Sequence, residues 1–250
     1  MKNSSWLIRG LLPLFGLALF LIVWQVVAGF YNPVLVPSPV ETGLALFFLA
    51  VSGQLWEQIH LTIIRGLTGF GLAVVVGTPL GLLIGLNSMA DSLFRPLVVV
   101  LQVTPLVSWL LLAMIWIGFS KVPVFVVFVT TMPLIIINTI QGAKSVDRQL
   151  LQMAITFRVS RRRIIWEVYL PQVIPYLLAG LTAALGTTWK AVAMAELFSV
   201  NKGIGAGMAV ARMNLETAAL FAWTLFLIGL GLLTDRLLAY LTQQKLTHWK

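Results

Sequence analysis

The sequence contains no cysteine, which excludes disulfide bonds and thiolate metal sites. Histidine is nearly absent as well, because only His60 and His248 occur and they lie far apart in the chain. Charged residues make up 10% of the sequence, whereas soluble domains carry about 25%. There is no HExxH motif and no pair of carboxylates within an apolar segment. These absences argue against metal-dependent or nucleophilic catalysis, including catalysis by a membrane-embedded enzyme.

Apolar residues dominate instead, at 59% of the chain with a mean hydropathy of +0.96. This composition predicts an all-α, polytopic membrane protein with a single transmembrane domain over residues 1–250. We expect about six spans, over residues 11–30, 61–86, 97–119, 124–140, 173–200 and 218–240. A net charge of +9 would suggest nucleic acid binding in a soluble protein. Here the basic residues gather in short loops, where membrane orientation and contact with lipid head groups explain them without nucleic acid.

The first apolar run, residues 11–30, follows the basic residues Lys2 and Arg9. A cleaved signal peptide is the alternative interpretation, but its apolar region would be roughly 7–15 residues long. We therefore favour an uncleaved span with its basic end in the cytoplasm. Six spans place both termini in the cytoplasm, and Lys245 and Lys250 near the C-terminus agree with that placement.

Local signals predict the form of several segments between and within the spans. Ser38 is a candidate N-cap with Glu41 three residues later, which predicts a short helix over residues 39–51 at the outer interface. Gly77, Gly81 and Gly85 would let neighbouring helices approach closely in lipid. The run KGIGAGM at residues 202–208 has no strand before it, so a flexible outer or re-entrant turn is expected rather than a dinucleotide site.

A polar island at residues 141–171 separates two spans, and its positive charge predicts a cytoplasmic loop. Ser145 can cap a helix that starts at Val146, and Ser160 can cap a second helix after a break near residues 158–159. Apolar residues recur through the first helix at spacings of three and four, namely at Val146, Leu150, Met153, Ala154 and Phe157. Two short capped helices predict a compact docking knob.

The island resembles the cytoplasmic signature E-A-A-x3-G-x9-I-x-L-P of permease subunits of ATP-binding-cassette (ABC) importers. The aligned residues are Gln152, Met153, Ala154, Arg158, Val168, Leu170 and Pro171. The segments PSPVE, GTPLGLLIGL, PLVVVLQVTPLVSWLLLAMIWIG and WKAVAMAELFSVNKGIG look like the branch that imports nitrate, sulfonate, taurine and bicarbonate. The resemblance covers nearly the whole chain and implies the type I importer, or MetI-like, permease fold.

This resemblance implies that the knob fits a groove in a separate ATPase subunit, and that two such subunits, which bind ATP and Mg, close together and drive the spans through it. It implies no cofactor and no metal site in this chain, which also lacks a GxxxxGK[ST] motif. The expected partners are a second permease copy, as a homodimer rather than a heterodimer, and an external or periplasmic binding protein. The expected location is the inner or plasma membrane. The coupling residues would be Gln152, Met153, Ala154, Phe157, Arg158, Val159, Ser160, Leu170 and Pro171.

Two positions depart from the family signature. Gln152 replaces the usual acid, and Arg158 replaces the usual glycine at a turn where glycine is favoured if φ is positive. Three explanations are open: another turn geometry, an ATPase groove adapted to a bulky cation, or the degenerate half of a heterodimeric permease. Outside the resemblance, the island could be a helix-turn-helix, although its place between two spans argues against DNA binding, or its arginines could serve only orientation and lipid contact.

The candidate translocation residues are Arg65, Trp189, Lys190 and Glu196, which are polar or aromatic residues within apolar segments. A cationic lining would suit a small anion, although small polar organic solutes, including heterocyclic vitamin precursors, stay open. The alternative is that Lys190 reaches outward to the interface or pairs with Glu196. Arg212 and Glu216 are weaker candidates for an outer gate. A stand-alone secondary transporter or channel would account for these residues but not for the capped knob.

Overall fold

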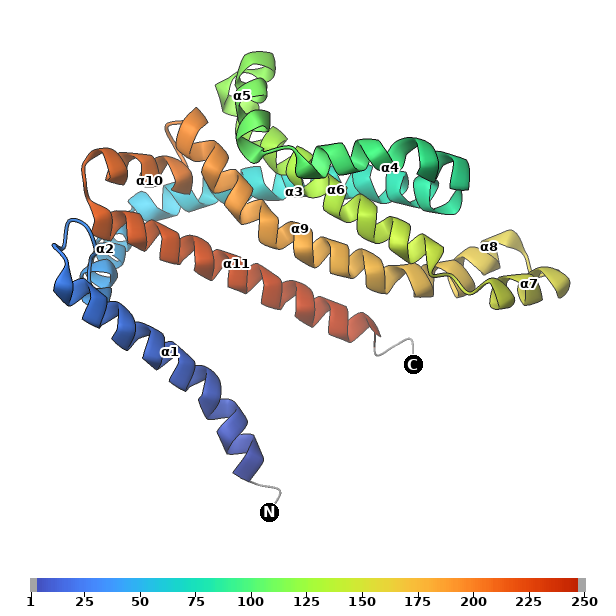
Figure 1. Cartoon of the computed structure of the whole chain (residues 1–250), viewed down its shortest axis with the longest axis horizontal. Coiled ribbons are helices and arrows are strands. Elements are labelled where there is room, and N and C mark those ends of the chain that lie inside the picture. Colours follow the sequence, from blue (N-terminus) through green and yellow to red (C-terminus); the bar gives the residue numbers. More distant parts are fainter. Residues whose placement is uncertain (1–3, 247–250) are drawn as a thin grey trace.

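The computed structural model describes residues 4–246, and within this range the regular structure is helical, with no β-strand (Figure 1). Five helices are long and apolar enough to cross a membrane, and a bent pair would make a sixth span. The predicted all-α architecture with about six spans is therefore confirmed. The helices are α1 (Ser4–Phe30), α2 (Pro39–Val51), α3 (Gln54–Leu86), α4 (Ser88–Val103), α5 (Leu106–Ile117), α6 (Val122–Lys144), α7 (Arg148–Thr156), α8 (Arg161–Ile164), α9 (Leu170–Ser199), α10 (Ile204–Met213) and α11 (Thr217–Leu246), with a 3-10 turn at Phe119–Lys121 and a π-helical turn at Ile165–Tyr169.

Some residues that entered the predictions about the two chain ends lie outside residues 4–246. Lys2, His248 and Lys250 lie outside the described residues. The cytoplasmic placement of both chain ends therefore stays a prediction.

The core consists of α3, α6 and α9, with α6 in the middle and most deeply buried. Glycines at positions 69, 77, 81 and 85 of α3 face α6, so the two backbones approach closely. A Cβ atom at Gly81 would lie 2.6 Å from Cβ of Thr139, and one at Gly85 would lie 2.6 Å from Cβ of Ala143. The predicted role of Gly77, Gly81 and Gly85 in close helix packing is confirmed.

The span predicted over residues 97–119 is broken near its middle. Two helices, α4 and α5, meet there at 94°, and α5 turns away from the long axis of the molecule (Figure 1). Pro105 has no backbone N–H and disfavours helix at the preceding residue, and Thr104 is accordingly extended with ψ 126°. The helix α4 begins directly after α3, because the Asn87 side chain accepts a hydrogen bond from the N–H of Met89 at 2.9 Å and caps α4.

Residues 39–51 form the predicted short helix, α2. The N–H of Glu41 donates to Ser38 Oγ at 3.2 Å, and the N–H of Ser38 donates to Glu41 Oε2 at 2.8 Å, which completes a capping box. Two other predictions need correction. The span expected from residue 61 begins earlier, at Gln54. Most of the flexible turn expected at residues 202–208 is helical, because α10 begins at Ile204.

The α3–α6 contact predicts that Gly81→Val lowers stability by about 1–3 kcal/mol, because the added side chain would overlap Thr139. Gly71→Val is the matched control on the same helix, since a Cβ atom there meets nothing within 4 Å. Thermal unfolding of both variants in the same detergent measures the difference. Equal midpoints would contradict the close-packing argument.

Candidate functional site

The segment between α6 and α9 forms the predicted knob, which projects beyond the ends of these two helices (Figure 1). Its first helix, α7, is capped by Asp147, whose Oδ1 accepts a hydrogen bond from the N–H of Gln149 at 2.7 Å. The predicted cap at Ser145 and helix start at Val146 are therefore wrong. Ser145 has helical φ and ψ and ends α6, whereas Asp147 has the extended backbone that an N-cap requires.

The turn between α7 and α8 is closed by backbone hydrogen bonds. The N–H of Val159 donates to the carbonyl of Ala154 at 3.0 Å, and the N–H of Arg158 donates to the carbonyl of Ile155 at 2.9 Å. Arg158 adopts a left-handed conformation with φ 53°, as expected at a helix C-terminus. The predicted break at residues 158–159 is confirmed, and an alternative geometry no longer explains the arginine. Ser160 precedes α8 with an extended backbone, but its side chain makes no capping hydrogen bond.

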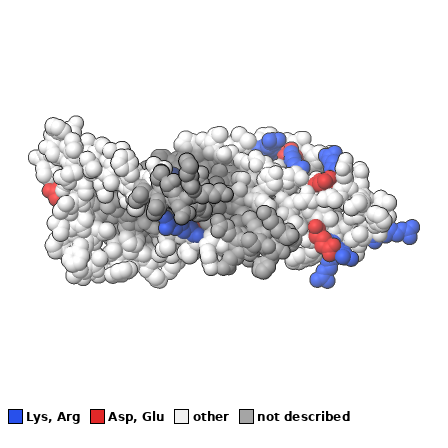
Figure 2. Space-filling model, turned by 90° about the horizontal axis from the view of Figure 1, so that it is seen from below, with Lys and Arg blue, Asp and Glu red and all other residues white. Residues whose placement is uncertain are grey.

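One part of the predicted apolar face of α7 is buried against the rest of the protein, and the other part is exposed to solvent. Val146 is buried and Ala154 is half-buried, whereas Met153 and Phe157 are exposed, Phe157 to 76%. Figure 2 shows that most of the charged side chains on the face it presents lie over the end of the molecule that carries α7 and α8. The knob therefore presents an apolar ridge, Met153 and Phe157, within a charged surface.

Polar contacts join the knob to the long helices. The N–H of Asp147 donates to Gln172 Oε1 on α9 at 2.8 Å, and Lys144 Nζ lies 2.5 Å from Asp91 Oδ2 on α4. Between α8 and α9, the π-helical turn includes a hydrogen bond from the N–H of Leu170 to the carbonyl of Ile165. Displacement of the knob would therefore be transmitted directly to α9. Lys144 is the last residue of α6, so its ion pair joins the end of α6 beside the knob to α4.

A second polar cluster lies at the opposite end of α9, around Glu196. This carboxylate is completely buried, and it accepts hydrogen bonds from Arg65 Nη1 at 2.8 Å, Thr62 Oγ1 at 2.7 Å and the N–H of Gly205 at 3.1 Å. Arg65 also donates to the carbonyl of Lys202 at 2.6 Å. One carboxylate thus holds together α3, the end of α9 and the start of α10.

The chain must pass very close to this carboxylate. Gly203 has φ 125°, and a Cβ atom there would lie 2.3 Å from Glu196 Cδ, so only glycine fits. The N–H of Gly203 donates to Oε1 of Gln58, one turn of α3 away from Thr62.

The structure brings together two of the four predicted pathway residues, Arg65 and Glu196. Trp189 is buried in the core, where its Nε1 donates to Thr234 Oγ1 at 2.9 Å. Lys190 is exposed and lies outside the cluster, and the alternative that it pairs with Glu196 is wrong because Arg65 takes that position. The sequence reasoning missed Gln58 and Thr62, although their spacing of seven and three residues before Arg65 places them on the same helix face.

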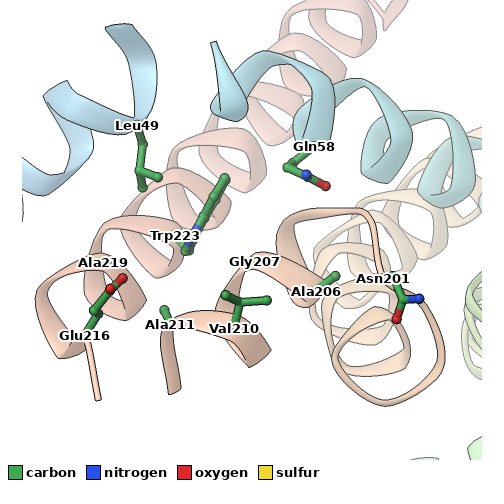
Figure 3. Close-up of a pocket in the computed structure, with 10 residues that line it drawn as sticks. All are labelled: Leu49, Gln58, Asn201, Ala206, Gly207, Val210, Ala211, Glu216, Ala219 and Trp223. Carbon is green, nitrogen blue, oxygen red and sulfur yellow. The ribbon is translucent and has the colours of Figure 1, made fainter. Parts of the chain in front are cut away.

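A pocket of about 160 Å³ lies beside this cluster, between α2, α3, α10 and α11. Figure 3 shows Gln58 and Trp223 on one side and the small side chains of α10 on the other. Glu216, one of the weaker gate candidates, is exposed at its rim, and Arg212 is exposed on α10. In the described part of the chain, no three His, Cys, Asp or Glu side chains are grouped closely enough to hold a metal ion.

The buried ion pair predicts that Glu196→Gln destabilises the protein by about 3 kcal/mol, because Arg65 loses its counter-charge. Adding Arg65→Met should recover part of this loss, so the double variant should be more stable than the sum of the single effects. Lys202→Ala is the control, since its ion pair with Glu57 is exposed and contributes about 1 kcal/mol or less. Strictly additive losses in thermal unfolding would contradict the coupling.

Comparison with solved structures supports the fold. Chains of the MetNI methionine ABC transporter in inward-facing conformations match with a TM-score of 0.60 and 18% identity, over 81% of this chain and 97% of that chain.

Sequence comparison identifies the family. The model for "binding-protein-dependent transport system inner membrane component" matches residues 77–246. A probable ABC transporter permease protein of Brucella abortus is 33% identical, over 94% of this chain and 96% of the relative. The bicarbonate transport system permease protein CmpB of Synechococcus elongatus is 29% identical, over 92% of this chain and 87% of the relative. The nitrate import permease protein NrtB of a Synechocystis species is 28% identical, over 92% and 86%. The chain therefore belongs to the binding-protein-dependent transport system inner membrane components, and it is a multi-pass permease subunit of an ABC importer.

Proposed function

We propose that this chain forms the translocation pathway for a small anion or a small polar organic solute, and that the knob couples this pathway to separate ATPase subunits, of which the importer contains two. The observation that carries this proposal is the knob itself. It has an exposed apolar ridge, Met153 and Phe157, and a hydrogen bond to α9, and the end of α6 beside it is held to α4 by the Lys144–Asp91 ion pair. A rigid element that joins a docking surface to membrane helices can convert partner binding into a change between two states of those helices.

The coupling surface would comprise residues of α7, of the turn that follows it and of the start of α9, namely Gln152, Met153, Ala154, Phe157, Arg158, Val159, Ser160, Leu170 and Pro171. ATP and Mg would bind to the partner subunits. The chain itself carries no GxxxxGK[ST] motif, and we assign it no catalytic residue, cofactor or metal.

The basic island supports a cytoplasmic position for residues 141–171, with both termini on the same side. The Glu196 cluster and the pocket beside it would then face outward, toward a binding protein. We further propose that residues 1–250 form one permease domain that pairs with a second copy. The capped α7 and the intact turn at Arg158 favour a working knob, and thus a homodimer, over a degenerate half.

The solute proposal rests on the relatives and on Lys190. Two relatives are named for bicarbonate and nitrate, which are both anions. Lys190 is an exposed cation on α9, close in sequence to the buried Trp189. In the assembled importer such a cation would favour an anion in the pathway.

The docking role predicts that Ala154→Asp or Leu170→Asp uncouples transport from ATP hydrolysis, because each variant puts a charge beside the apolar ridge or at the base of the knob. Solute uptake into proteoliposomes containing the ATPase should fall by about tenfold or more, since an uncompensated charge in an apolar contact costs several kcal/mol. Gln149→Asp, at an exposed position of the same helix, is the control. Normal uptake by both variants would refute docking at the knob, and uptake without any ATPase would indicate a secondary transporter.

The proposed role of Lys190 predicts a change in the rate of solute uptake and no change in the assembly of the complex. Lys190→Ala should reduce uptake of an anion such as nitrate or bicarbonate without changing the mass of the purified complex. Lys121→Ala is the matched control, because Lys121 is an exposed lysine in the turn between α5 and α6. Unchanged uptake would show that Lys190 only reaches the membrane interface.

A further inference from the structure

Arg158 occupies a backbone conformation that arginine adopts at a cost. Its φ of 53° is one of two positive values among the non-glycine residues that the structure describes. The turn is closed by backbone hydrogen bonds alone, from the N–H groups of Arg158 and Val159 to the carbonyls of Ile155 and Ala154. Glycine would form the same turn with less strain. The arginine is therefore not needed to build the knob, and a local strain of this kind indicates a use for the side chain.

The part of the chain that the structure describes offers no partner for the Arg158 side chain. Arg158 is exposed, and its guanidinium forms no hydrogen bond or ion pair with the side chains described between residues 12 and 240. The carboxylates of the knob and its flank are already engaged. Glu167 pairs with Arg163 at 2.7 Å, Asp147 caps α7, and Asp91 pairs with Lys144. A carboxylate for Arg158 would have to come from another molecule.

The surroundings of Arg158 indicate which molecule that is. Phe157 precedes it with 76% of its surface exposed, and Met153 lies one turn back on α7. Arg161 and Arg162 follow, both exposed. A groove that covers this apolar ridge would also remove water from the guanidinium at its edge. A cation that loses its water requires a carboxylate, and arginine forms two parallel hydrogen bonds with one.

We propose that Arg158 is a specificity-determining contact, and that the groove of the ATPase subunit presents a carboxylate to it. This inference rests on the proposed docking of an ATPase at the knob. It follows that the permease selects an ATPase with an acidic groove and rejects one whose groove is neutral or basic at this place, because an unpaired buried cation is unfavourable. Gln152 on α7 carries no charge, so this position supplies no acid that would compete for the arginine.

The test compares Arg158→Gly with Arg158→Lys in complete permeases, held in nanodiscs of neutral phosphatidylcholine and titrated with the cognate ATPase subunit at low and high salt. Arg158→Gly removes the charge and the backbone strain together. It should bind the ATPase about tenfold more weakly at low salt, with a smaller salt dependence. Its thermal midpoint should stay the same or rise. Arg158→Lys should retain most of the salt dependence, and Arg148→Gln is the control at another exposed arginine of α7.

Three outcomes would overturn the proposal. If Arg158→Gly matches the wild type in affinity and salt dependence while Ala154→Asp abolishes binding, the knob docks without using the arginine. A defect confined to nanodiscs that contain anionic phosphatidylglycerol would assign Arg158 to lipid head groups. Failure of the wild-type permease to bind any ATPase would refute the proposed docking as well.

Discussion

Backbone contact between α3 and α6 is the constraint on which the other parts of the structure depend. Lipid offers apolar side chains as good an environment as a neighbouring helix does, so association in the membrane relies on close packing. Gly81 and Gly85 allow that packing, and α9 covers the other side of α6. The helices that carry the Glu196 cluster and the knob are thereby fixed relative to each other.

The two polar regions lie at opposite ends of α9 and differ in how their charges are satisfied. Glu196 is buried and neutralised by Arg65, with every contact supplied by the chain itself. The knob instead leaves Arg158 and the Met153–Phe157 ridge in solvent. A site satisfied internally stabilises one arrangement of helices, whereas an unsatisfied surface is available for a partner that can alter that arrangement.

The sequence alone predicted the local structure correctly where a capping motif or a helix break lies within a few residues. The capping box at Ser38 and Glu41 predicted α2 to the residue, and the break at residues 158–159 was located correctly. The prediction from sequence failed where the same residues are compatible with more than one local structure or more than one partner. Pro105 can kink a helix or end it, and the right angle between α4 and α5 depends on the extended Thr104. Glu196 pairs with Arg65 and not with Lys190, because α3 packs against the end of α9. The spacing of residues along one helix gives no information about such contacts between distant segments.

The π-helical turn at Ile165–Tyr169 makes the orientation of the knob depend on the number of residues in the polar island, residues 141–171. A π turn holds one residue more than an α turn, so its removal would rotate everything before it by about 100° about the helix axis. The knob would then present a different side to its partner while α9 kept its place in the core. The number of residues between Arg158 and Leu170 thus determines how the knob is oriented about the axis of α9. A one-residue deletion there would turn an otherwise intact docking surface away from its partner.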